Sequence, residues 1–251
     1  MYSFNSRVRY SEVDEDQELS VTGILNYLQD CSTFQSEDLK LGIDYLNENH
    51  RAWWLSSWQI VIERYPRLGE EIVVSTWPYD FKGIYGYRNF TIRDRQGDYL
   101  VKANSVWFFF DTEAGRPVRV GEKDVRGYGT AGDKKLEMEY APRRIALPSQ
   151  YDEAPVIPVA RHHIDTNHHV NNAQYVEIAR EALPAGIKIR ELRAEYKKAA
   201  VQGDILHPRV SREGDCFTVA LCDEEGTPYA VVWLRAVIEQ TVMEQAAGQQ
   251  K

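Results

Sequence analysis

The stretch IDTNHHVN, residues 164–171, decides how the chain is interpreted, because a related stretch, VDEDQELS, stands at residues 13–20. The two align without gaps, so that Asp165 of the later copy falls on Asp14 of the earlier one. A helical pattern of apolar residues follows each copy directly. Such self-similarity predicts an internal repeat, and a repeat changes the expected fold of the whole chain.

The two helical patterns occupy residues 21–34 and 172–183. Apolar residues recur there at the i, i+3, i+4 and i+7 spacing that is typical of a helix with one face in the core. Ser20 or Thr22 is expected to cap the first helix, and Pro184 to end the second. The predicted core faces consist of Val21, Ile24, Leu25, Leu28 and Cys31 in the first helix, and of Val170, Ala173, Val176, Ala179 and Leu183 in the second.

The similarity continues downstream of the helices. RYPRLGEEI at residues 64–72 resembles KKAAVQGDI at residues 197–205. FTIRDRQGDYLVKANSVWFFF at residues 90–110 resembles FTVALCDEEGTPYAVVWLRAV at residues 217–237. Three matches in the same order predict a twofold duplication of one structural unit.

Each unit is expected to place several strands after its helix. Short turns that contain glycine separate the strands, so the sheet should be largely antiparallel. Two such units can share one continuous sheet, which removes two exposed edges. The predicted strands are residues 54–65, 71–81, 85–94 and 99–110 in the first half, and 188–199, 205–213, 216–223 and 228–238 in the second.

We therefore predict an α+β fold with two long helices, each wrapped by an antiparallel sheet that is continuous between the halves. The N-terminal unit is expected at residues 1–110 and the C-terminal unit at residues 161–251. Residues 111–160 are rich in glycine, proline and charge and show little periodicity, so we interpret them as the connection.

Composition narrows the class of protein. The chain has 251 residues, a net charge of -8 and a pI of about 5.4, and an acidic protein is a poor candidate for nucleic-acid binding. No run approaches the roughly 18 apolar residues of a membrane span, and no secretory signal is recognised at the N-terminus. The odd set of Cys31, Cys216 and Cys222 indicates buried thiols in a reducing compartment. We expect a cytoplasmic protein, and the sequence allows a homodimer without specifying one.

The pattern D-x-N-x-H formed by Asp165, Asn167 and His169 is the candidate catalytic site. It stands just before a helix, where unpaired backbone N–H groups near Val170 and Asn171 would stabilise an oxyanion. His169 would activate a water or polarise a carbonyl, and Asn167 would orient substrate or water. Asp165 would hold the histidine or act as the base itself.

The earlier copy supports this interpretation. It carries Asp16 in place of Asn167 and Glu18 in place of His169, so it keeps the frame of the turn without the imidazole and the carboxamide. A purely structural turn would not require the copies to diverge there. Simple helix capping is an alternative, and so is metal binding by His162, His163, His168 and His169, although no metal-ligand spacing on one helix face supports the latter. We interpret the first three of these histidines as loop residues.

The segment DTNHHVNNAQYVEIA, residues 165–179, resembles the D-x-N-x-H-V-N-N-x-x-Y segment of the acyl-acyl-carrier-protein thioesterases of plant plastids and bacteria. The Trp-rich stretch WWLSSWQIVIERYPRLGEEIVVSTW, with RNFTIRD and ANSVWFFFD after it, is similar to the first half of the same family. The resemblance covers residues 5–238 approximately. It implies a tandem (double) hotdog fold and hydrolysis of the thioester between a fatty acyl chain and the phosphopantetheine arm of acyl carrier protein, with no metal and no cofactor.

By position, the resemblance assigns catalysis to Asp165, Asn167 and His169, and leaves the first half to shape the acyl pocket. The chain departs from the plant pattern in EYKKAAV, residues 195–201, where Ala199 and Ala200 replace an acidic residue and a cysteine. No cysteine nucleophile is therefore expected there, and the general base is expected to be Asp165 or His169. Glu177 is a further candidate, whereas Glu195 is too far along its strand from residue 199 to substitute.

Aromatic residues of the first half are the candidates for the acyl pocket, namely Trp53, Trp54, Trp58 and Tyr85. Docking of the acidic carrier protein would need a local basic patch, and the sequence offers Lys188, Arg190, Arg193, Lys197 and Lys198. Two other functions remain open at this point. One is an acyl-CoA thioesterase, and the other is a non-catalytic hotdog that binds acyl chains.

Overall fold

The computed structural model describes residues 1–129 and 134–237 of the chain. The predicted connection and the predicted C-terminal unit therefore each include residues that lie outside the described part.

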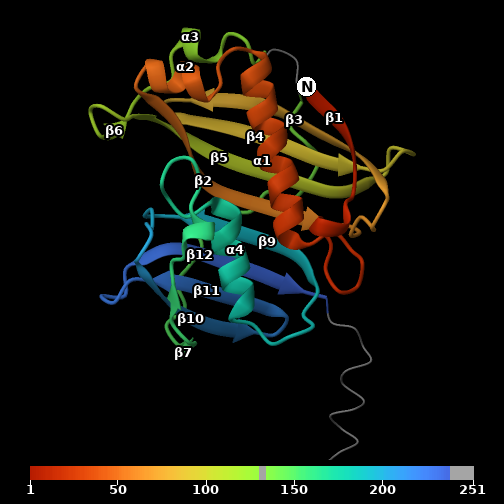
Figure 1. The fold of residues 1–251 in the computed structure, drawn as a ribbon, viewed down its shortest axis with the longest axis vertical. Coiled ribbons are helices and arrows are strands. Elements are labelled where there is room, and N and C mark those ends of the chain that lie inside the picture. The colour runs from red at the N-terminus through yellow and green to blue at the C-terminus, as the bar shows by residue number, and fades with distance from the viewer. Residues whose placement is uncertain (130–133, 238–251) are drawn as a thin grey trace, which may run out of the picture.

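One antiparallel sheet runs through both halves of the described chain (Figure 1). Its strand order is β1-β3-β4-β5-β2-β9-β12-β11-β10-β7, and the short strands β6 and β8 pair with β5 and β10. The long strands are β1 (Tyr2–Arg7), β2 (Arg51–Ile62), β3 (Glu71–Lys82), β4 (Tyr85–Arg93), β5 (Tyr99–Asp111), β9 (Ile189–Tyr196), β10 (Ile205–Glu213), β11 (Cys216–Cys222) and β12 (Pro228–Ala236). The two-residue strands are β6 (Arg116–Pro117), β7 (Asp152–Glu153) and β8 (Ile157–Pro158).

The halves join at the pair β2 and β9. These strands are antiparallel, and Trp58 of the first half stands opposite Ala194 of the second. The sheet is thus continuous between the halves, as the repeat predicted. This pairing removes one exposed sheet edge from each half, because the N–H and C=O groups of both strands bond to the other half.

The helices α1 (Val21–Asp38) and α4 (Asn172–Glu181) lie on the same face of this sheet, and α4 runs beside the N-terminal part of α1 (Figure 1). The predicted stripes of both helices are buried, and Leu28 and Val176 are fully inaccessible, except that Leu183 is half-buried and lies beyond the end of α4. Ser20 caps α1 by accepting the N–H of Gly23, whereas Thr22 bonds to Glu177 of the other helix. The second helix is the shorter, with 10 residues against 18, so only α1 is a long helix.

The duplication is visible in individual hydrogen bonds. The Asp14 N–H donates to Glu18 O at 2.9 Å, and the Asp165 N–H donates to His169 O at 2.8 Å. Gln17 in one copy and His168 in the other both have a φ of 61°. The same turn therefore precedes both helices, although Asp14 and Asp165 are the one identical pair among the eight aligned positions.

The sequence analysis overlooked β1, which pairs with β3 at the edge of the sheet. Its side chains alternate between half-buried and exposed positions, and most of them are polar. An edge strand needs hydrogen bonds on one side only and little apolar surface, so it carries a weak sequence signal. The short helices α2 (Ile43–Glu48) and α3 (Glu122–Val125) were also not predicted.

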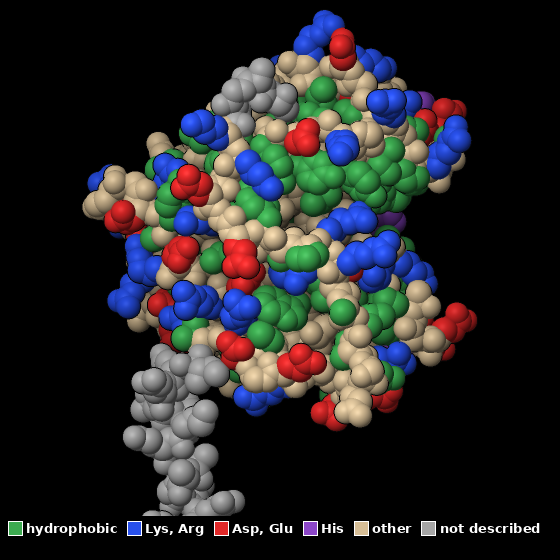
Figure 2. Space-filling view, turned by 180° about the vertical axis from the view of Figure 1, so that it is seen from behind, with side chains coloured by type: hydrophobic (Ala, Val, Ile, Leu, Met, Phe, Trp, Pro, Cys, Tyr) green, Lys and Arg blue, Asp and Glu red, His purple; other side chains and the backbone are tan. Residues whose placement is uncertain are grey.

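Residues 134–145 of the connection pack on the face of the sheet opposite to α1 and α4. Gln59 donates to the Glu139 carbonyl, and Glu195 accepts the N–H of Ile145. Ile145 also packs with Ala220, Cys222 and Val231 in a small second core. Figure 2 shows the molecule from this side, with hydrophobic side chains in patches between charges of both signs. The segment is therefore part of the structure and covers strands of both halves.

The three thiols are unpaired, and the predicted burial is complete for Cys31 and Cys222, while Cys216 is half-buried. Across the described residues, no helix combines the length and apolar character that crossing a membrane requires.

Candidate active site

The D-x-N-x-H stretch forms a tight loop that is closed by an antiparallel bridge between Ile164 and Val170. His168 adopts a left-handed conformation at the tip, and the Asp165 carboxylate accepts the backbone N–H of Asn167 at 2.8 Å. Short polar side chains stabilise such turns by bonding to their own backbone two residues further on. The sequence thereby holds the loop in a defined conformation directly before α4.

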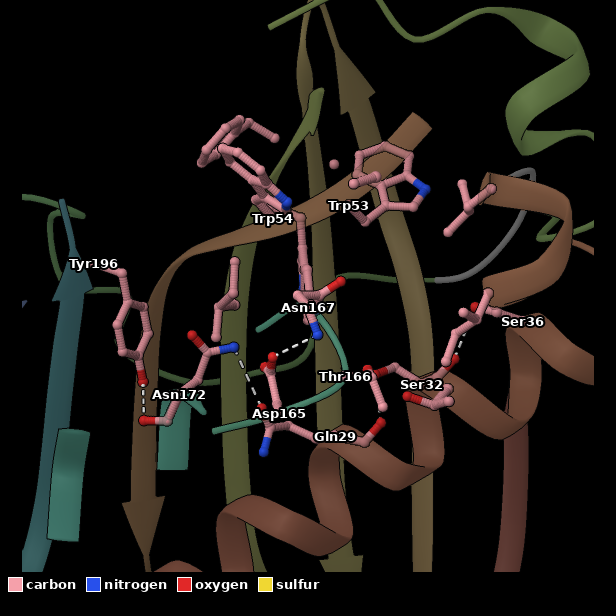
Figure 3. A pocket seen from close by; sticks show the side chains of 18 of the residues that line it. Gln29, Ser32, Ser36, Trp53, Trp54, Asp165, Thr166, Asn167, Asn172 and Tyr196 are labelled. Carbon is pink, nitrogen blue, oxygen red and sulfur yellow. Dashed lines mark hydrogen bonds between the residues drawn. The ribbon is translucent and has the colours of Figure 1, made fainter. Parts of the chain in front are cut away.

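A cavity of about 600 Å³ lies between this loop, α1 and the first residues of β2. Asp165, Asn167 and His169 all line it, together with Trp53 and Trp54. Figure 3 shows the loop below the two indoles and beside Gln29, Ser32 and Ser36 of α1. The structure thus brings the three predicted catalytic residues to one cavity whose other walls come from the first half of the chain.

His169 is half-buried and stands beside Trp54, with ring centroids 6.2 Å apart and planes at 84°. Its imidazole makes no hydrogen bond with any described residue, and in particular none with the Asp165 carboxylate. The expectation that Asp165 holds the histidine directly is therefore wrong for this conformation. Asp165 instead shapes the turn on which His169 stands.

The backbone groups predicted as oxyanion donors are already engaged. The Val170 N–H donates to the Ala200 carbonyl at 2.9 Å, and the Asn171 N–H donates to the His163 carbonyl at 2.8 Å. Asn171 instead caps α4, since its side chain accepts the N–H of Ala173. The first N–H of the helix, that of Asn172, has no acceptor among the described residues. Asn172 also lines the cavity, so it replaces Val170 and Asn171 as the candidate donor.

Two of the four aromatic residues proposed for the acyl pocket are in place, and two are not. Trp53 and Trp54 line the cavity, whereas Trp58 is 2% exposed and packs on Phe90 in the core. A β-bulge between Leu55 and Ser57 reverses the alternation of β2, so residues 54 and 58 point to different faces of the sheet. Tyr85 lies outside the cavity and accepts a hydrogen bond from Arg143 of the connection.

Two family models match the chain in tandem. The acyl-ACP thioesterase N-terminal domain matches residues 1–128, and the acyl-ACP thioesterase C-terminal domain matches residues 148–230. The chain belongs to the acyl-ACP thioesterase family.

Curated members of this family show the same relationship at low identity. The palmitoyl-acyl carrier protein thioesterase of Arabidopsis thaliana is 24% identical over 80% of this chain and 53% of its own length. The dodecanoyl-[acyl-carrier-protein] hydrolase of Cinnamomum camphora is 24% identical over 86% of this chain and 61% of its own length. The chain thus spans little more than half the length of these chloroplastic relatives.

Solved structures of acyl-ACP thioesterases share the fold over most of the chain. The enzyme of Bacteroides thetaiotaomicron has a TM-score of 0.84 at 23% identity, covering 94% of this chain and 97% of that one. The 12:0-ACP thioesterase of Umbellularia californica has a TM-score of 0.83 at 19% identity, covering 94% and 98%. The double hotdog fold is therefore confirmed.

Neither of the two glutamates considered as a substitute for the acidic residue missing at position 199 of this acyl-ACP thioesterase family member lines the cavity. Ala199 lines the cavity, and Ala200 is fully buried behind it. Glu177 bonds to Thr22 and Arg180 between the two helices, outside the cavity. Glu195 is buried on the opposite face of the sheet, where it accepts the N–H of Ile145, so it is separated from Ala199 by the sheet as well as by distance along the strand.

The remaining histidines of the motif have other roles in this family member. His163 is buried, and its Nδ1 accepts the Ala160 N–H at 3.1 Å, as Glu12 accepts the Arg9 N–H in the first half. Burial lowers the pKa of His163, which keeps the imidazole neutral and able to accept. His162 and His168 are exposed, as expected, whereas the expectation of a loop residue is wrong for His163, which is buried at the end of a short 3-10 helix.

The basic residues proposed for docking are divided by the sheet. Arg193 donates to carbonyls of the connection on the far face, and Lys188 pairs with Glu18. Lys197 and Lys198 are exposed and line the cavity. Of the five residues proposed for docking, Lys197 and Lys198 alone line the cavity.

Proposed function

We propose that this chain hydrolyses the thioester of fatty acyl-acyl carrier protein and releases a free fatty acid and the holo carrier protein, as a step of fatty acid biosynthesis. One observation carries the proposal. The D-x-N-x-H loop of the second half opens into a cavity whose aromatic wall, Trp53 and Trp54, belongs to the first half. In this proposal the thioester lies beside His169 and the acyl chain extends along α1.

Catalysis in this proposal is direct attack by water. His169 accepts a proton from water as the hydroxide oxygen bonds to the thioester carbon, and Asn167 orients the substrate. The oxyanion is stabilised at the start of α4, where the Asn172 N–H is available. Collapse of the tetrahedral intermediate breaks the C–S bond, and His169 returns the proton to the departing thiolate. An acyl-enzyme is not part of the scheme, because alanine occupies position 200.

The carrier protein would approach from the side of Lys197 and Lys198. Carrier proteins of this kind are acidic, and this chain has a net charge of -8, so attraction depends on local cations near the cavity. Lys198 already pairs with Asp223 at 3.1 Å, and Lys197 pairs with Glu195 at 3.1 Å. Docking would therefore exchange one set of ion pairs for another, which favours weak and reversible association.

Release of free thiol from acyl-carrier-protein substrates of graded chain length is the decisive assay. Matched acyl-CoA substrates should react more slowly, and the reverse order would identify an acyl-CoA thioesterase. Binding of acyl groups without thiol release would identify a non-catalytic acyl-binding protein. We further propose a cytoplasmic location, supported by unpaired thiols, and size-exclusion chromatography with light scattering would decide between a monomer and a homodimer.

A further inference from the structure

The end of the cavity remote from the catalytic loop carries a buried positive charge. Arg88 projects from β4 toward α1, is 8% exposed, and lines the cavity. One nitrogen, Nη1, donates to the Gln35 side chain and to Thr76 Oγ1. The guanidinium group also lies over the ring of Tyr128, 5.2 Å from its centroid.

No carboxylate of the described residues pairs with Arg88, and its Nε and Nη2 have no acceptor there. Burial lowers the pKa of Arg88 to about 10, so the group remains charged at neutral pH. An unpaired buried charge is unfavourable for folding, and proteins normally compensate such a charge. A guanidinium group with free donors matches the two oxygens of a carboxylate.

The side of α1 that faces the cavity is polar as well. Gln29, Ser32 and Ser36 line the cavity opposite Trp53 (Figure 3), and Ser36 shares a hydrogen bond with the Tyr128 hydroxyl at 2.7 Å. A slot that receives only a hydrocarbon chain would gain from aliphatic residues here, since each buried methylene contributes about 0.8 kcal/mol. The polar stripe and Arg88 together favour a ligand with an oxygen-bearing far end.

We propose that the inner end of the cavity binds a carboxylate at the distal end of the acyl chain, so that the preferred substrates are thioesters of medium-length dicarboxylic acids. This inference rests on the proposed thioester hydrolysis at the catalytic loop. Gln29 lies at the end of the cavity next to the D-x-N-x-H loop, because its side-chain oxygen accepts a hydrogen bond from the Asn172 side chain at 3.4 Å. Gln35 lies at the other end, where it accepts a hydrogen bond from Arg88.

The same two residues give the length of the ligand. Six helical residues separate Gln29 from Gln35, which is about 9 Å along the axis. An extended chain advances about 1.2 Å per covalent bond. The carboxylate should therefore lie roughly seven to eight bonds from the thioester carbon, and longer or shorter diacids should bind less well.

Isothermal titration calorimetry with the full chain tests the inference without requiring turnover. The ligands are free dicarboxylic acids of graded length and the matching monocarboxylic acids. We expect the wild-type protein to bind one medium-length diacid at least about tenfold more tightly than its monoacid, and Arg88→Gln to weaken diacid binding by about thirtyfold or more. Arg143→Gln, on the other face of the sheet, is the matched control.

Two results would overturn the inference. One is monoacid binding that equals or exceeds diacid binding at every length in the wild-type protein, a comparison that needs no variant. The other is an unchanged preference in a folded Arg88→Gln protein, with Arg88→Lys as the variant that keeps the charge if Gln fails to fold.

Thiol release from carrier-linked versions of the same acyl groups separates this inference from the proposed function. Diacid binding without any thiol release would refute hydrolysis and leave the carboxylate site standing. Rapid release from plain acyl substrates, with slower release from every ω-carboxyacyl substrate, would refute the carboxylate site and leave hydrolysis standing.

Discussion

The imidazole of His169 meets the indole of Trp54 edge to face, with centroids 6.2 Å apart, and the two residues belong to different halves of the duplicated chain. Trp54 also stacks on Phe110, with ring centroids 3.9 Å apart, so Phe110 supports the indole. His169 belongs to the second half of the chain, but the aromatic side chain beside it belongs to the first half. This contact depends on the junction of β2 and β9, which holds the two halves in one sheet.

His169→Ala should lower turnover by about 10²–10⁴, because the variant lacks the general base. Its thermal midpoint should change little, since the imidazole makes no hydrogen bond to the described protein. His168→Asn is the matched control, because asparagine tolerates the positive φ of this exposed neighbour. Full activity of His169→Ala in a thiol-release assay would remove this residue from the mechanism.

Trp54→Ala should mainly lower activity, whereas Trp58→Ala should mainly lower stability. Trp54 lines the cavity, so its loss should reduce kcat/KM by about tenfold with a stability cost of about 1 kcal/mol from the lost aromatic pairs. Trp58 is buried in the core, so its truncation should lower the free energy of unfolding by about 3–5 kcal/mol. Chemical denaturation alongside steady-state kinetics measures both, and equal kinetic damage from the two variants would contradict the assigned positions.

Ala199→Glu tests the departure from the plant pattern. Position 199 is exposed to the cavity, so a glutamate side chain fits there without repacking. If the new carboxylate takes the base role, it remains ionised down to about pH 4.3 and should extend the rate profile toward acid pH. Ala199→Gln, which has the same shape without the charge, is the control. A glutamate variant with the same profile as the glutamine variant would show that a carboxylate at 199 adds nothing here.

The stability of the first half should depend on Glu70. Hydrogen bonds from Arg64 lower the pKa of Glu70, with the Arg67 N–H assisting. A carboxyl group whose pKa is lower in the folded state stabilises that state above its unfolded pKa, and this contribution is lost as the pH falls through the folded value. Glu70→Gln should therefore be less stable than the wild-type protein at pH 7, by about 1 kcal/mol or less because the pair is partly exposed.

The difference between Glu70→Gln and the wild-type protein should disappear at acid pH, where the carboxylate is protonated in both states. Urea denaturation at a series of pH values measures it. A stability difference that stays constant down to acid pH would mean that the side chain acts through packing rather than through charge.

Much of the fold follows from local patterns in the sequence. The eight long strands after the helices were predicted close to their observed bounds, because their alternating or continuous apolar residues and their glycine turns are local signals. The loop of Asp165 was also predictable, since its copy at Asp14 has the same spacing. The edge strand β1 was missed because it buries little apolar surface.

Arg88 had a signal that the sequence analysis did not use. In β4 it alternates with Gly86, Phe90 and Ile92, so period-two spacing places a charge on the face that is otherwise apolar. The position of Arg88 in β4 does not show which groups contact its side chain, because its partners Gln35 and Thr76 are distant in the sequence.

The sequence by itself determined the antiparallel strands and the candidate catalytic loop from patterns a few residues long, and the duplication from the recurrence of such patterns in the same order in the second half. Only the tertiary structure decided that Trp54 faces His169 while Trp58 is core, since one extra residue in a bulge reverses the alternation. It also decided which N–H groups are free, because Val170 and Asn171 donate to carbonyls that distant segments supply. Hydrogen bonds and cavity walls are properties of segments that meet in space, and no local pattern records which segments meet.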